Sequence, residues 1–114
     1  MFEYVSKSEF INRFLKHEER NRNFSYEGLV VLFEYLENWE EETGEKIEFD
    51  MVGICCDYVE YDSIEDYVRE YDVKVQKKNY KTKDEYNQAV IEHIQDNTKY
   101  IPIPDTERFI IMFY

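Results

Sequence analysis

The chain has 114 residues, an aromatic share of 18% and a formal net charge of −12 at pH 7. This length suits one domain, residues 1–114, and the apolar share of 43% is enough to build a core, so the charge does not imply disorder. The charge argues against nucleic acid and anionic membranes as direct partners, because binding to either depends on Lys and Arg.

Two helices are expected in the first part of the chain. The capping pattern S-x-x-E at Ser6 precedes a helix over about 6–20, in which apolar residues recur at helical spacing. A second helix is expected to follow Ser25 as its N-cap and to run to about Thr43, where Gly44 ends it. Its buried face would carry leucines and aromatic residues.

The segment 47–58, IEFDMVGICCDY, is expected to be a strand. It begins with alternating apolar and acidic residues and then becomes wholly apolar, which is typical of a strand that enters a covered core. Adjacent residues of a strand point to opposite faces, so we expect Cys55 and Cys56 to be reduced, buried thiols. Acidic and apolar surroundings raise the pKa of a thiol, which argues against a cysteine nucleophile.

Two further helices are expected in the second half of the chain. Ser63 begins a capping pattern for a short helix to about Tyr71, and Thr82 begins one for a longer helix to about Asp96. The residues between them, 73–80, are compatible with a strand or a loop.

The last fifteen residues are expected to form two extended runs around a turn. Pro102 and Pro104 cannot donate to a ladder, so the first run belongs at a sheet edge or bulge, whereas 109–113 is a strand. The fold class is therefore α+β, with three to four helices packed on one face of a small, mainly antiparallel sheet.

The sequence offers little for catalysis. His17 and His93 have no second histidine or cysteine at metal-ligand spacing, no glycine-rich phosphate loop is present, and the acidic run after Asp57 lacks the glycine of a calcium loop. Paired carboxylates would need a deep cleft, for which so small a domain has little room. We expect no enzyme, no catalytic residue, no metal and no cofactor.

The negative charge is concentrated in the middle of the chain. Residues 34–72 hold fifteen acidic and two basic residues, a formal charge of −13, whereas the rest holds eleven acidic and twelve basic residues, about +1. Acidic residues on a protein surface often do no more than keep it soluble. That explanation does not account for their concentration in one third of the chain, so we favour a selected acidic face.

The expected end of the second helix carries acids where they cost stability. Glu40, Glu41 and Glu42 lie in the last turn, at the negative end of the helix dipole, and each costs about 0.3–1 kcal/mol at low salt. Tyrosines interleaved with acids can anchor an interface or stack on arginines. The candidate partner-binding residues are the acids Glu37, Glu40, Glu41, Glu42, Glu45, Asp57, Glu60, Asp62, Glu65 and Asp66, together with Tyr58 and Tyr61.

The motifs YLE and EEETGE precede an apolar segment that contains a double cysteine. This part of the chain resembles a recurrent segment of small proteins encoded by phages and mobile elements of low-GC Gram-positive bacteria. The likeness covers residues 24–71 and the C-terminal FIIMFY, and it implies no activity for individual residues. Small acidic phage proteins include anti-CRISPR and antirestriction proteins that imitate DNA. The chain is similar to these in size and charge, although its basic stretch VKVQKKNYKTK would confine any mimicry to one face.

The expected function is inhibition of a host defence nuclease, RNA-guided or restriction, by an acidic face that fills the nuclease's basic nucleic-acid groove. The alternative is a regulatory adaptor that docks on a host protein through an aromatic patch or a strand edge. No apolar run approaches the roughly 18 residues of a membrane span, and the N-terminus lacks the order of a secretory signal, so we expect a cytoplasmic protein.

Overall fold

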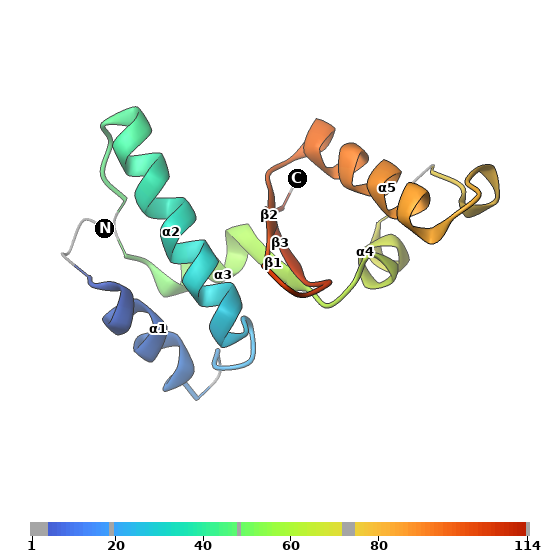
Figure 1. Cartoon of the computed structure of the whole chain (residues 1–114). Helices are drawn as coiled ribbons and strands as arrows, with labels where there is room; N and C mark the ends of the chain where they lie inside the picture. The colour runs from blue at the N-terminus through green and yellow to red at the C-terminus, as the bar shows by residue number, and fades with distance from the viewer. Residues whose placement is uncertain (1–4, 19, 48, 72–74, 114) are drawn as a thin grey trace.

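The computed structural model describes residues 5–18, 20–47, 49–71 and 75–113, and Figure 1 shows how its elements are arranged. A small sheet stands in the middle of the molecule, with one group of helices on either side of it. The α+β class expected from the sequence is confirmed, and the described residues contain five α-helices.

The first two helices are capped as predicted. Helix α1 (Lys7–Leu15) begins after Ser6, whose hydroxyl accepts a hydrogen bond from the Glu9 amide, and ends earlier than the expected residue 20. Helix α2 (Tyr26–Thr43) follows Ser25, and Gly44 ends it with a φ of 72°. Glycine adopts this left-handed conformation without the clash that a Cβ would cause.

The strand predicted over 47–58 is wrong. Residues Met51–Asp57 form helix α3, and only Tyr58–Tyr61 form a strand, β1. A short apolar run fits either a strand or a buried helix, and here helix α3 buries Ile54 in the core. Ile47, Phe49 and Met51 still pack against the core, which explains the alternation that suggested a strand.

Because residues 51–57 form a helix and not a strand, the exposure of the two cysteines also differs from the expectation. Both thiols are free, as expected, but Cys55 is half-buried and Cys56 is exposed, so the prediction that both are buried is wrong. Burial raises the pKa of the Cys55 thiol, although the nearby Arg20 opposes this shift.

The second half follows the predicted order. Helix α4 (Ile64–Glu70) begins after Ser63 and helix α5 (Lys83–Asn97) after Thr82, and each capping hydroxyl accepts a hydrogen bond from an amide three residues on. Between them, Lys77–Asn79 form a single 3-10 turn, η1. Residues 72–74, part of the stretch compatible with strand or loop, lie outside the described residues.

The sheet is antiparallel, in the order β1-β3-β2. Strand β2 (Tyr100–Pro102) lies at one edge, as the prolines predicted, and β3 (Phe109–Met112) lies in the centre. The register pairs Val59 with Ile111 and Ile101 with Ile110.

Helices cover both faces of the sheet, which corrects the expectation of one covered face. Ile110 of β3 faces the first core cluster, built with α1, α2 and α3, whereas Phe109 and Ile111 face the second cluster, built with α4 and α5. A strand whose residues are apolar on both sides needs cover on both sides. The central strand β3 thus contributes side chains to both hydrophobic clusters.

Candidate functional site

The C-terminal end of α2 presents exposed acids. Glu41 and Glu42 in the last turn of α2 and Glu45 beyond it are exposed, Glu37 is half-buried, and the last turn contains no basic residue. These carboxylates add to the negative end of the dipole of an 18-residue helix. We call Glu37, Glu41, Glu42 and Glu45 the acidic surface.

A groove lies beside this surface, between α2 and α3. Its volume is about 390 Å³, and Tyr35 and Trp39 of α2 and Tyr58 of β1 contribute aromatic walls. Asp50 and Asp57, at the two ends of α3, also line it. We call this cavity the α2–α3 groove. It could not be predicted from the sequence, because it exists only once residues 51–57 are helical.

Glu40 has a structural role in place of the expected partner-binding role. Only 8% of it is exposed, and its carboxylate accepts a hydrogen bond of 2.8 Å from the amide of Ile47. Burial raises the pKa of Glu40, but hydrogen bonds, including the one from Ile47, outweigh burial and hold the pKa below its usual range. Glu40 therefore fastens the segment after α2 onto the helix.

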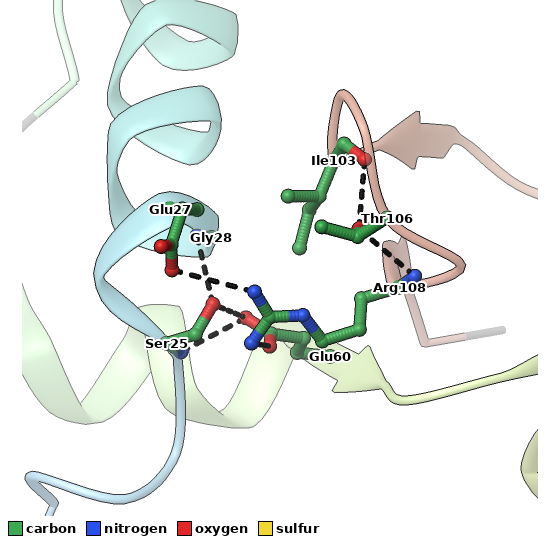
Figure 2. Close-up of polar contacts among 7 residues, drawn as sticks. All are labelled: Ser25, Glu27, Gly28, Glu60, Ile103, Thr106 and Arg108. Carbon is green, nitrogen blue, oxygen red and sulfur yellow. Dashed lines mark hydrogen bonds and ion pairs between the residues drawn. The ribbon is translucent and has the colours of Figure 1, made fainter.

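Glu60 has a second structural role, at the start of α2. Figure 2 shows its carboxylate accepting hydrogen bonds from the amide and hydroxyl of Ser25, at 3.0 and 3.1 Å. Arg108 pairs with Glu60 at 3.8 Å and with Glu27 at 3.3 Å. The Glu60 side chain is 7% exposed, so this cluster joins α2 to β1 and to the turn before β3 and is not a docking surface.

The Thr106 side chain holds the backbone at Arg108 in place. The Thr106 hydroxyl donates to the carbonyl of Ile103 and accepts from the amide of Arg108, as Figure 2 shows. Arg108 belongs to no motif in the sequence. The excess of acids among residues 24–60 is the one sign in the sequence that a cation from elsewhere in the chain pairs with them.

The two candidate tyrosines lie in the cores. Tyr58 is 9% exposed and contacts Tyr35 edge-on, whereas Tyr61 is 4% exposed and donates a hydrogen bond to Glu70. Burial, with Tyr35 and Asp57 nearby, raises the pKa of Tyr58 to about 12. Burial and the bond to Glu70 also raise the pKa of Tyr61. Both phenols stay protonated at neutral pH, and Tyr58 lines the α2–α3 groove.

The later acids form a separate group around α4. Asp62 is exposed, Asp66 pairs with Arg69 at 2.7 Å, and Glu65 pairs with Lys83 at 3.7 Å. A hydrogen bond from its own amide, assisted by Lys83, lowers the pKa of Glu65. Figure 1 places α4 on the other side of the sheet from α2, so the structure does not bring the two groups of acids into one patch.

Other kinds of site find no support in the described residues. These residues contain no cluster of three or more His, Cys, Asp or Glu that could hold a metal ion. Among them, no helix is both long and apolar enough to cross a membrane. Comparison with models of protein families, with curated proteins and with solved structures finds no match to this chain.

Proposed function

We propose that the chain is a cytoplasmic, non-enzymatic inhibitor of a host defence nuclease, of the anti-CRISPR kind, and that its acidic surface occupies the nuclease's basic nucleic-acid groove. The observation that carries the proposal is the exposed set Glu41, Glu42 and Glu45, none of which forms an ion pair within the described part of the chain. Arrays of carboxylates attract the same Lys and Arg side chains that bind phosphates.

The cost of these acids to the fold supports a role in binding. Lysines in the last turn of α2 would gain about 0.3–1 kcal/mol each from the dipole, so the helix is less stable with glutamates there. Glu40 and Glu60 are explained by the hydrogen bonds that they accept. Within the described part of the chain, Glu41, Glu42 and Glu45 form no ion pair, unlike Glu27 and Glu34 of α2, so a basic partner gives them a use.

The test measures whether the chain prevents a labelled DNA duplex from binding to purified, guide-loaded RNA-guided nucleases and restriction nucleases of Gram-positive bacteria, read as fluorescence anisotropy. We expect the native chain to compete with DNA, and the triple variant Glu41→Lys, Glu42→Lys, Glu45→Lys to compete at least tenfold more weakly. The reversals remove unfavourable dipole interactions, so loss of folding would not explain the result.

The matched control is the triple variant Glu92→Lys, Asp96→Lys, Glu107→Lys. These acids are exposed, lie outside α2 and the acidic surface, and give the same change in net charge. We expect this variant to inhibit nearly as well as the native chain. Equal loss in both triple variants would contradict a localised acidic surface, and native chain that leaves DNA binding unchanged in every nuclease would contradict the proposal.

The adaptor is the second candidate function, because Val52 of α3, Met112 at the end of β3 and Phe113 after it are exposed apolar side chains. Ionic strength separates the two candidates. Inhibition by charge should weaken steeply between 50 and 200 mM salt, whereas docking through an apolar surface should change little.

A further inference from the structure

The α2–α3 groove has the shape and size of a binding site for a single long side chain. Its volume of about 390 Å³ lies at the low end of the range of about 300–1,000 Å³ typical of ligand pockets. Most of its lining is apolar, and Tyr35, Trp39 and Tyr58 offer ring surfaces. Such surfaces suit the hydrocarbon stem of a long side chain and the flat face of a guanidinium.

Two carboxylates line the groove, those of Asp50 and Asp57. Within the described part of the chain, neither Asp50 nor Asp57 forms an ion pair. Asp50 is the N-cap residue of α3, but its side chain caps no amide there. Its carboxylate lies over Gly53 instead, where an added Cβ would come within 2.6 Å of it, and both residues line the groove.

The charges around the groove favour a cation. Lys99 is the only basic residue among the lining residues that the structure describes, and it is outnumbered by Asp50 and Asp57. Glu42 lies on the same face of α2 as Tyr35 and Trp39, and burial followed by the charge of Glu42 raises the pKa of Tyr35. The negative end of the α2 dipole adds to this potential.

We propose that the α2–α3 groove receives an arginine side chain of the partner protein, its stem against the aromatic walls and its guanidinium at Asp50 and Asp57. The inference rests on the proposed function, since the basic groove of a nuclease would supply the arginine. Arginine fits better than lysine because its planar head stacks on rings, binds carboxylates in a bidentate manner and is less strongly hydrated. The acidic surface would then attract the partner, and the groove would fix its position.

The chain has one tryptophan, so the groove has its own reporter. The indole N–H resonance of Trp39 would be followed by NMR while a capped Gly-Arg-Gly tripeptide is added to the full chain. We expect a saturable shift in the millimolar range. The matched probe Gly-citrulline-Gly, which has nearly the same shape without the charge, should bind at least fivefold more weakly.

Two variants test the residues that carry the inference. Gly53→Ala adds a methyl group in the lining, which displaces the Asp50 carboxylate from its place over residue 53 without changing charge. The pair Asp50→Asn, Asp57→Asn removes charge without changing shape. We expect each to weaken tripeptide binding at least fivefold. The pair Asp84→Asn, Asp105→Asn removes the same charge at exposed sites that do not line the groove and should leave binding unchanged.

The inference is overturned if the Trp39 resonance does not respond, if citrulline binds as well as arginine, or if the control pair loses as much as the groove pair. The titration contains no nuclease, so its failure is separate from failure of the proposed function. The proposed function is tested by the DNA competition assay. If the native chain does not reduce DNA binding to any nuclease there, inhibition is contradicted, whatever the result of the tripeptide titration.

Discussion

At the scale of single residues, the acids of this chain divide by burial into two kinds. Glu40 and Glu60 are nearly buried and accept hydrogen bonds from amides, so they stabilise the fold. The sequence does not distinguish these two residues from Glu41, Glu42 and Glu45, yet the latter three are exposed. A buried carboxylate needs partners to offset its desolvation, and those partners lie up to 48 residues away in the chain, as Arg108 does for Glu60.

Two helical glycines give a prediction at this scale. A Cβ on Gly28 would overlap the carboxylate of Glu60, which Ser25 and Arg108 hold in place. We expect Gly28→Ala to destabilise the chain by about 1–3 kcal/mol, because overpacking against a fixed group exceeds the helix-propensity gain. Gly53→Ala meets only the mobile end of the exposed Asp50 side chain, so we expect it to stabilise the chain by up to about 1 kcal/mol.

Urea denaturation of both variants, followed by circular dichroism, measures the two free energies of unfolding. Each glycine variant serves as the control for the other, because the substitution and the type of secondary structure are the same. Opposite signs support the contacts described around Glu60 and Asp50. A stabilised Gly28→Ala variant would show that the Glu60 carboxylate is free to move.

At the scale of elements, the ends of helices were easier to predict than the identity of short apolar segments. Ser6, Ser25, Ser63 and Thr82 all cap the helices that their spacing predicted. Capping is a contact between residues three apart, so the sequence contains both partners. Helix α3 has no side-chain cap and only seven residues, so its pattern gave no local sign of a helix.

The N-caps of α1 and α2 give a prediction at this scale. The Ser25 hydroxyl accepts from the amide of Gly28 at 2.9 Å and donates to Glu60, whereas the Ser6 hydroxyl makes only an exposed cap. We expect Ser6→Ala to cost about 1 kcal/mol and Ser25→Ala about 2–3 kcal/mol, because the latter also removes a donor from a buried carboxylate.

Thermal and urea unfolding of the two serine variants measure this difference. The double variant Ser25→Ala, Glu60→Gln provides a further check, since the two losses should be less than additive if the groups interact. Equal losses for Ser6→Ala and Ser25→Ala would mean that the Ser25–Glu60 contact contributes nothing to stability.

At the scale of the whole molecule, β3 determines how the two halves depend on each other. The molecule measures 48 × 33 × 24 Å, with α1, α2 and α3 on one side of the sheet and α4 and α5 on the other (Figure 1). Ile110 packs in one cluster and its neighbours Phe109 and Ile111 in the other. Loss of either cluster therefore exposes one face of the same strand.

We predict that the two clusters unfold in one transition. Trp39 fluorescence reports on the first side of the sheet. Near-ultraviolet circular dichroism, to which Tyr61, Tyr67 and Tyr71 contribute through their mutual edge-on and stacked ring contacts, reports on the second. The two urea midpoints should coincide within error, because a shared central strand couples the clusters. Two separate midpoints would contradict the expectation of a single domain.

The sequence by itself determined the helix caps, the edge position of the prolines, the strand near the C-terminus and the α+β class, since each depends on residues close together in the chain. It also located the excess of negative charge, which composition alone reveals.

Only the tertiary structure decided that Met51–Asp57 is helical, that both faces of the sheet are covered, and which acids are buried. These features depend on contacts between distant segments: Glu60 with Ser25 and Arg108, and the aromatic walls of the α2–α3 groove with α3. Burial is a property of the packed chain and not of a residue type. The exposed acids that can bind a partner could therefore be identified only after the structure showed which acids, such as Glu40 and Glu60, are buried and hydrogen-bonded within the fold.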